Sequence, residues 1–242
     1  MPKYTGTCRI PEKMASCWLR FHYFLFAKQM TPEKIEEMFE RFEKANPDPR
    51  SELQFNNPYE LLVAVILSAQ ATDISVNKAT DKLYPVANTP ETIIALGVEG
   101  LKSYVKTINL YPTKSKNIIR MSEILLEKHD GKVPADREAL EALPGVGRKT
   151  ANVVLNTAFN QMTMAVDTHI FRVSNRTGLA PGKNVLEVEK GLVKVIPPKY
   201  MMNAHHWLLL HGRYVCKAKN FQCENCLIND LCEFPDKTTA AK

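Results

Sequence analysis

Long apolar runs are absent from this sequence. The longest uninterrupted one extends from Leu61 to Leu67, whereas a helix that crosses a bilayer needs about 20 apolar residues, so we expect no membrane span and no membrane partner. The chain has 242 residues, of which 45% are hydrophobic and 24% charged. This composition is typical of a globular protein with a substantial core and excludes the disordered and fibrous classes.

Cysteine is scarce as well, since the chain contains only six, too few for a disulfide scaffold. Four of the six nevertheless lie close together near the C-terminus: Cys216, Cys223, Cys226 and Cys232. Four thiolates at such spacing can enclose one metal centre, which indicates a protein from a reducing compartment. Zinc is one candidate occupant, although its structural sites usually combine two short cysteine or histidine pairs and only one short pair is present here.

Acidic residues are missing from long stretches of a chain whose net charge is +6. Residues 102–120 and 190–223 contain no acid, and residues 142–186 contain a single one, Asp167. Acids are concentrated instead in residues 31–60, which hold eight of them against four bases. Any one basic cluster can be an ordinary solvated surface, but the three stretches together predict a cationic face that binds a polyanion such as nucleic acid.

Residues 1–29 differ from the rest of the chain. They carry five bases against one acid and two isolated cysteines, Cys8 and Cys17, without a helical period. The segment lacks the clean apolar core of a secretory signal and the arginine and serine content of a mitochondrial presequence. Our hypothesis is that translation begins at Met30 and that the leader is a misread upstream segment, which mass spectrometry of the native N-terminus would test. We expect the protein in the bacterial cytoplasm, with the mitochondrion or the nucleus as alternatives for a eukaryotic source.

Helical patterns follow one another after this leader. Thr31-Pro32-Glu33 is a typical helix start, and the apolar residues after it keep the i, i+3, i+4, i+7 spacing of one buried face. Further helices are predicted to start at or to span the following positions: Asn57, Thr89, 114–129, 136–143, 148–159 and Asn184. No stretch alternates apolar and polar residues convincingly over five or more positions. The sequence therefore predicts an all-α fold.

Two of these helices are joined by a short glycine-containing turn, residues 143–147. Gly145 and Gly147 allow a turn whose peptide N–H groups all point outward at the positive end of the second helix, where a phosphate oxygen can bind. An ordinary connection between helices also uses proline and glycine. Because Arg148 and Lys149 follow directly, we interpret the turn as a phosphate-binding hairpin.

The sequence LPGVGRKTAN, residues 143–152, followed by Val166-Asp167-Thr168-His169 and the four cysteines, closely resembles the helix-hairpin-helix DNA glycosylase/AP lyase family with a [4Fe–4S] cluster. The resemblance extends from about Glu52 to Cys232. It implies a base excision repair enzyme that removes oxidised pyrimidines from double-stranded DNA through a lysine Schiff base and nicks the abasic site by β-elimination. By this resemblance Lys149 is the nucleophile, Asp167 is the catalytic carboxylate and the cysteines hold the cluster. We expect a monomer, because the lesion has no two-fold symmetry.

The chemistry of an amine nucleophile sets a requirement of its own. An amine must lose its proton before it attacks the sugar C1′, yet an ordinary lysine has a pKa of about 10.4, and a helix N-terminus disfavours an ammonium by only about 0.3 to 1 kcal/mol. We therefore expect burial in a cleft and the neighbouring guanidinium of Arg148 to assist Lys149. Asp167 is expected to stabilise the positive charge that develops on the sugar, and it can at the same time cap the helix after it. His169 is given a supporting role.

The DNA contacts follow from the resemblance alone. In the family a polar side chain fills the space that an extruded nucleotide leaves, and an apolar wedge supports the opposite strand; the matching positions are Gln70 and Leu110. Asn109 stands where the family commonly has glycine, and asparagine tolerates the left-handed backbone that such a position requires. Lys217 and Lys219, between the first two cysteines, are either phosphate contacts or solubilising lysines.

The resemblance also implies two helical domains that flank a DNA-binding cleft. A continuous domain of residues 51–161 carries the hairpin, and a discontinuous one of residues 30–50 and 162–242 carries the cluster.

Two other hypotheses about the function remain open. One is an adenine-removing relative, which normally lacks the lysine and has an added C-terminal domain. The other is a non-catalytic hairpin module that only holds DNA and needs neither Lys149 nor Asp167.

Overall fold

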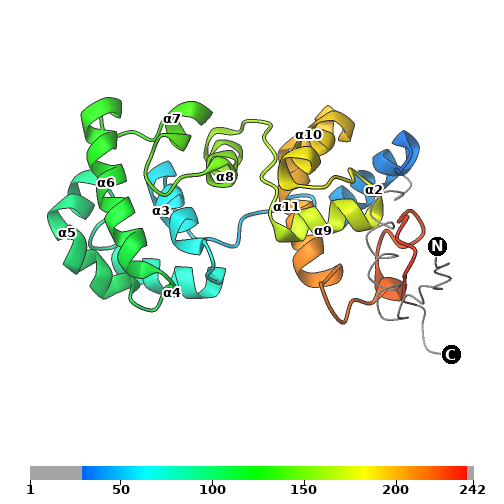
Figure 1. Cartoon of the computed structure of the whole chain (residues 1–242), viewed down its shortest axis with the longest axis horizontal. Helices are drawn as coiled ribbons and strands as arrows, with labels where there is room; N and C mark the ends of the chain where they lie inside the picture. Colours follow the sequence, from blue (N-terminus) through cyan, green and yellow to red (C-terminus); the bar gives the residue numbers. More distant parts are fainter. Residues whose placement is uncertain (1–28, 239–242) are drawn as a thin grey trace, which may run out of the picture.

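The computed structural model describes residues 29–238, so the leader hypothesis and its two cysteines lie outside the described residues. Within this range every regular element is a helix, which confirms the all-α prediction. Figure 1 shows two groups of helices side by side, linked by the chain segments that precede α3 and follow α8. No helix in the described part of the chain is long and apolar enough to cross a membrane.

The first group of helices encloses one hydrophobic core. Its members are α3 (Pro58–Ser68), α4 (Asp73–Leu83), α5 (Pro90–Val105), α6 (Tyr111–His129), α7 (Arg137–Glu141) and α8 (Arg148–Phe159). The apolar run noted in the sequence is the centre of α3, where every residue from Tyr59 to Leu67 is buried. Because α3 packs against α4, α6 and α8, a helix that is apolar all round is stable here without a membrane.

The second group encloses a separate core that combines the two ends of the described chain. Its α-helices are α2 (Pro32–Ala45), α9 (Thr168–Thr177), α10 (Val185–Val195) and α11 (Met201–Leu210). Shorter turns complete it: η1 (Pro198–Tyr200), the π-helical η2 (His211–Val215) and η3 (Cys223–Asn225). Phe39 of α2 stacks on Tyr200 with ring centroids 5.6 Å apart, which fixes the N-terminal helix onto the C-terminal half of the protein.

Most predicted helix starts are confirmed by their capping bonds. The side chains of Thr31, Asn57 and Asn184 accept from the backbone N–H three residues later at 3.4, 2.9 and 2.9 Å. Helix α8 has the predicted bounds. Helix α6 begins at Tyr111, before the predicted residue 114, and α7 is shorter than the predicted 136–143. The early start of α6 follows from Pro112, whose ring favours the first turn of a helix.

Candidate active site

A cleft of about 710 Å³ lies against residues of both cores. Its lining includes the following polar side chains: Gln70, Lys149, Asp167, His169, His205 and Arg213. Lys149 belongs to α8 of the first group and Asp167 directly precedes α9 of the second. Two residues that are distant in sequence and carried by different cores therefore face one cavity, as the resemblance implied.

The predicted hairpin leads into this cleft at the N-terminus of α8. Gly145 has φ +81°, a left-handed conformation that disfavours other residues. Gly147 caps α8, and a Cβ placed there would meet nothing within 4 Å, so its backbone is open to a close ligand. One detail of the prediction is wrong: the Val146 N–H donates to the Leu143 carbonyl at 3.1 Å and is not an outward-pointing donor. The remaining N–H groups of the first turn fit a phosphate oxygen.

The surroundings of Lys149 differ from those predicted. Lys149 is solvent exposed in the DNA-free protein. The Arg148 guanidinium is not available beside it, because Arg148 forms a bidentate pair with Glu189 of α10, at 2.9 Å from Nε and 2.6 Å from Nη2. The predicted burial of Lys149 beside a free Arg148 guanidinium is therefore wrong for the DNA-free protein. No ion pair joins Lys149 to Asp167 in the described part of the chain, so the carboxylate does not hold the ammonium in place either.

Asp167 has the capping role that the sequence predicted. Its Oδ1 accepts from the backbone N–H groups of His169 (2.9 Å) and Ile170 (2.8 Å), which makes it the N-cap of α9. Both capping bonds use the same oxygen, so Oδ2 is available toward the cleft that Asp167 lines. The cap fixes the direction of the carboxylate, and the positive end of α9 stabilises its charge.

His205 is a site residue that the sequence reasoning missed. It lies in α11, is 4% exposed, and lines the cleft with Lys149. Burial, assisted by the nearby charges of His206 and Lys149, lowers the pKa of His205 to about 3, and its Nδ1 has no partner among the described residues. The imidazole is therefore neutral at physiological pH and adds no positive charge to the cleft.

The buried His205 is expected to make the protein sensitive to acid. Below about pH 6.5 the unfolded chain takes up a proton at this residue and the folded protein does not, so stability is lost as the pH falls from about 6.5 toward 3. Lowering the pH from 7 to 5 should cost about 2 kcal/mol through His205. His205→Gln, which keeps a donor near the position of Nε2 but does not titrate, should flatten the pH dependence by that amount. Urea unfolding at pH 7 and pH 5 measures the free energy of unfolding of each protein. The same loss of stability between the two pH values in the parent and in His205→Gln would contradict the prediction.

Gln70 and Leu110 both have left-handed backbone conformations, with φ 56° and 58°. Gln70 is exposed at the end of α3 and lines the cleft, whereas Leu110 is 54% exposed before α6. The expectation for Asn109 is wrong, because Leu110 itself, and not Asn109, adopts the left-handed conformation. A left-handed conformation at a residue other than glycine is strained and persists only where the surrounding structure holds it.

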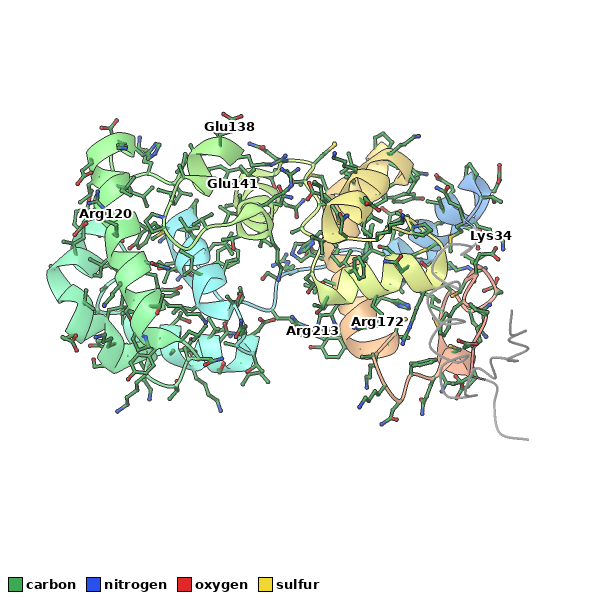
Figure 2. All side chains as sticks on the ribbon, viewed as in Figure 1. Lys34, Arg120, Glu138, Glu141, Arg172 and Arg213 are labelled. Carbon is green, nitrogen blue, oxygen red and sulfur yellow. The ribbon has the colours of Figure 1, made fainter. Side chains whose placement is uncertain are left out.

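Ion pairs join the two groups of helices, and the sequence alone did not indicate them. One is Arg148 with Glu189. The other is Arg213, which lies between the two groups of helices (Figure 2) and pairs with Glu52 and Asp73. Residues 142–186 and 190–223 were predicted to contribute to a cationic face, but Arg148 and Arg213 are neutralised within the protein.

Two further arginines of that face are engaged in structure. Arg172 of α9 donates to the carbonyls of Cys216 (2.9 Å) and Gly212 (2.6 Å). Arg176 donates to the Lys217 carbonyl at 2.6 Å. The exposed cations that remain for a polyanion therefore include Lys149, Lys217 and Lys219, a smaller set than the sequence suggested.

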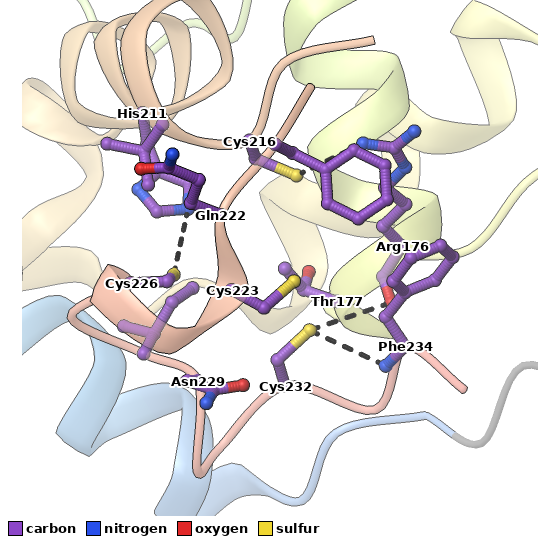
Figure 3. Close-up of a pocket in the computed structure, with 13 residues that line it drawn as sticks. Arg176, Thr177, His211, Cys216, Gln222, Cys223, Cys226, Asn229, Cys232 and Phe234 are labelled. Carbon is purple, nitrogen blue, oxygen red and sulfur yellow. Dashed lines mark hydrogen bonds between the residues drawn. The ribbon is translucent and has the colours of Figure 1, made fainter. Parts of the chain in front are cut away.

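The four C-terminal cysteines surround one cavity, with their side chains directed inward (Figure 3). Burial raises the pKa of Cys232 to about 11, and the Phe234 N–H lies 3.4 Å from its sulfur. His211 Nε2 is 3.7 Å from the Cys226 sulfur. Within residues 29–238 no three side chains converge closely enough to hold a single metal ion. The four thiols around one cavity are soft donors of the kind that bind zinc or an iron–sulfur cluster.

Comparison with known proteins agrees with this geometry. Residues 63–198 match the HhH-GPD superfamily of base excision DNA repair proteins. Endonuclease III of Escherichia coli (strain K12) is 62% identical over 208 residues, which are 86% of this chain and 99% of that protein. The chain belongs to the endonuclease III family. The endonuclease III of Haemophilus influenzae is 60% identical over the same shares of both chains.

Solved structures of endonuclease III share the fold. One, trapped as a covalent intermediate with DNA, has a TM-score of 0.79 and 45% identity, and the match covers 84% of this chain and 96% of that one. As a member of the endonuclease III family, the chain is a base excision repair DNA glycosylase with AP lyase activity. The interpretation of the sequence is confirmed at this level, and the non-catalytic hairpin module is excluded.

Proposed function

We propose that this enzyme removes oxidised pyrimidines from double-stranded DNA through a Schiff base on Lys149. The observation that carries the proposal is the cleft that Lys149 and Asp167 line from different cores. A nucleotide extruded from a duplex needs such a cavity, and its sugar would meet the amine on one side and the carboxylate on the other. We further propose that the enzyme acts as a monomer in the bacterial cytoplasm, which the bacterial source of its relatives supports.

Lys149 and Asp167 have different roles in the proposed reaction. The Lys149 amine forms a bond to C1′ while the bond from C1′ to the base breaks and its electrons leave with the base. The Asp167 carboxylate stabilises the positive charge that grows on the sugar and accepts a proton from the attacking nitrogen. The C1′–O4′ bond then breaks, its electrons go to O4′, which takes up a proton, and the product is an open-chain imine between Lys149 and C1′. This imine acidifies the C2′ proton, and loss of that proton expels the 3′ phosphate in a β-elimination. Lys149 is exposed before binding, so the amine is accessible to the sugar of an extruded nucleotide.

DNA is proposed to contact the hairpin and the two strained loops. The N–H groups around Gly145 and Gly147 would bind a phosphate, Gln70 would enter the vacated space, and Leu110 would support the opposite strand. Lys217 and Lys219 are exposed on the loop between the first two cysteines and would contact phosphates at a second point. Arg148 remains 42% exposed beside its carboxylate partner, so its contact with DNA would compete with the pair to Glu189.

We also propose that Cys216, Cys223, Cys226 and Cys232 hold a [4Fe–4S] cluster. The donor set supports it, because four thiols around one cavity provide soft ligands and leave no coordination position open. The cluster would supply structural cross-links and no Lewis acid. Within the chain, Arg172 and Arg176 connect the Cys216 loop to α9, which begins at the catalytic Asp167. The conformation of the cysteine loop therefore affects the position of α9.

Borohydride trapping tests the proposal. The enzyme is incubated with a duplex that contains one thymine glycol, and borohydride is added during the reaction. A covalent protein–DNA complex and, without borohydride, a nicked strand are expected, because the reductant converts an imine to a stable amine. Release of the base without a trapped complex would overturn the Schiff base. Activity on a mispaired adenine and none on thymine glycol would favour the adenine-removing alternative.

The charge of Asp167 can be tested separately from its capping role. Asp167→Asn keeps an oxygen that accepts from His169 and Ile170 but removes the negative charge. We expect base release in single turnovers to slow by about 10²- to 10³-fold, with the free energy of unfolding changed by less than about 0.5 kcal/mol. Asp167→Ala should in addition lose about 1 kcal/mol of stability with the cap. A fully active Asn variant would assign Asp167 a structural role alone.

A further inference from the structure

One buried cation connects the loops that carry Gln70 and Leu110. Lys114, in the first turn of α6, donates from Nζ to the carbonyl oxygens of Leu67 (2.7 Å) and Ala69 (2.5 Å). Its backbone N–H donates to the Leu110 carbonyl at 3.1 Å. A single residue therefore contacts the chain immediately before Gln70 and also Leu110 itself.

The position of Lys114 is unusual for a lysine. It is 6% exposed, and both acceptors of its ammonium are neutral carbonyls at the C-terminal end of α3, where the helix dipole is negative. Burial lowers the pKa of Lys114, as expected for a charge that is removed from water without a carboxylate. An apolar side chain would fill this space at lower cost. What the lysine adds is a fixed link between two backbone segments.

Both linked loops are strained at their tips. Gln70 and Leu110 are left-handed without being glycine, and such conformations persist only where the surrounding structure holds them. Without the Lys114 contacts the end of α3 could relax, and the Gln70 tip would move relative to Leu110.

The same face of α6 also supports the hairpin. Asn117, three residues after Lys114 and thus on the same side of the helix, packs against Gly145, where a Cβ would lie 3.2 Å from its Nδ2. The first turns of α6 therefore contact all three loops that the proposed function brings to DNA: those of Gln70, Leu110 and Gly145.

We propose that Lys114 is a positioning residue that holds Gln70 and Leu110 at a fixed separation, so that both side chains enter the duplex together as the damaged nucleotide leaves it. The inference rests on the proposed function, in which these two residues replace and support bases. It adds a residue that contacts neither the DNA nor the reacting atoms but determines whether extrusion succeeds.

Two substrates separate extrusion from chemistry. A duplex with one thymine glycol requires extrusion, whereas a single strand with a preformed abasic site requires only the Lys149 chemistry. We expect Lys114→Met to slow single-turnover base release from the duplex by about 10²-fold and to change trapping on the single strand by less than about threefold. Lys114→Arg, which keeps a cation with several donors, should recover most of the loss. Lys128→Met removes the same charge from an exposed position of the same helix and should behave as the parent.

A fluorescent 2-aminopurine opposite the lesion reports extrusion directly. It should brighten with the parent and with Lys128→Met but not with Lys114→Met. Because trapping on the single strand counts folded, competent enzyme, a variant that fails to fold would be recognised, and Lys114→Gln, with a shorter neutral donor, would then replace it. Equal losses on both substrates in a variant whose urea unfolding curve matches that of the parent, or none on either substrate, would overturn the inference. A parent that traps on neither substrate would instead overturn the proposed function.

Discussion

Replacing Lys149 by alanine is expected to abolish borohydride trapping and to slow strand nicking by about 10³-fold or more. The variant loses the nitrogen that bonds to C1′, and neither His205 nor Arg213 of the cleft lining can replace it. His205 is buried and Arg213 is engaged with Glu52 and Asp73. Affinity for the duplex should weaken by less than about tenfold, since a single phosphate-proximal charge contributes little compared with the whole interface.

Lys149→Arg makes this test sharper, because it keeps the positive charge and removes the nucleophile. A guanidinium stays protonated at any accessible pH, so this variant should bind DNA as the parent does and give no trapped complex. Lys82→Ala, in an exposed part of α4, is the matched control and should trap normally. Single-turnover nicking with gel separation of the trapped complex measures all three proteins. Trapping by Lys149→Arg would move the nucleophile to another residue.

Local features of the fold could be predicted from the sequence. Helix starts depend on one side chain and the next few N–H groups, so Thr31, Asn57 and Asn184 could be recognised without tertiary information. The left-handed conformation of the residue before α6 could not be predicted in this way. Asparagine is the better left-handed residue in isolation, but the structure has that conformation at Leu110, the N-cap of α6.

The candidate site was predictable only where a motif carried it. Lys149 and Asp167 belong to a recognisable sequence pattern, and the structure brings both to one cleft. His205 occurs in an apolar helix and has the pattern of an ordinary core residue. Lys114 belongs to a basic stretch and has the pattern of a surface lysine, although it is buried.

No local sequence pattern indicates the ion pairs that join the two groups of helices. Arg148 and Glu189 are separated by 41 residues and Arg213 and Asp73 by 140. Charge counts along the chain therefore overestimated the cationic face, because they cannot show which bases are neutralised by distant acids. The division into domains at residues 51–161 stays a prediction, although two separate cores are present.

Loss of one cysteine ligand is expected to have the largest effect on stability. Cys226→Ser should lower the free energy of unfolding by about 4 kcal/mol or more and remove the visible absorption of an iron–sulfur cluster. The physical reason is the small amount of other structure in this segment. Residues 217–225 are mostly exposed, and their only regular element is the three-residue η3. Contacts such as those from Arg176 to the Lys217 and Ala218 carbonyls are too few to order the loop without metal–thiolate bonds.

The Cys226→Ser experiment also distinguishes an iron–sulfur cluster from zinc as the group that the four cysteines hold. Purified protein should contain iron and sulfide in equal amounts and no zinc, and Cys8→Ser and Cys17→Ser should retain both. In Cys226→Ser the loop should become the first site of proteolysis, since unfolding begins where few buried contacts remain. Because Arg172 and Arg176 connect the loop to α9, base release should decline with the cluster, whereas the first core should keep its stability. Zinc in the parent, or an unchanged unfolding curve for Cys226→Ser, would show that the four thiols hold a different group.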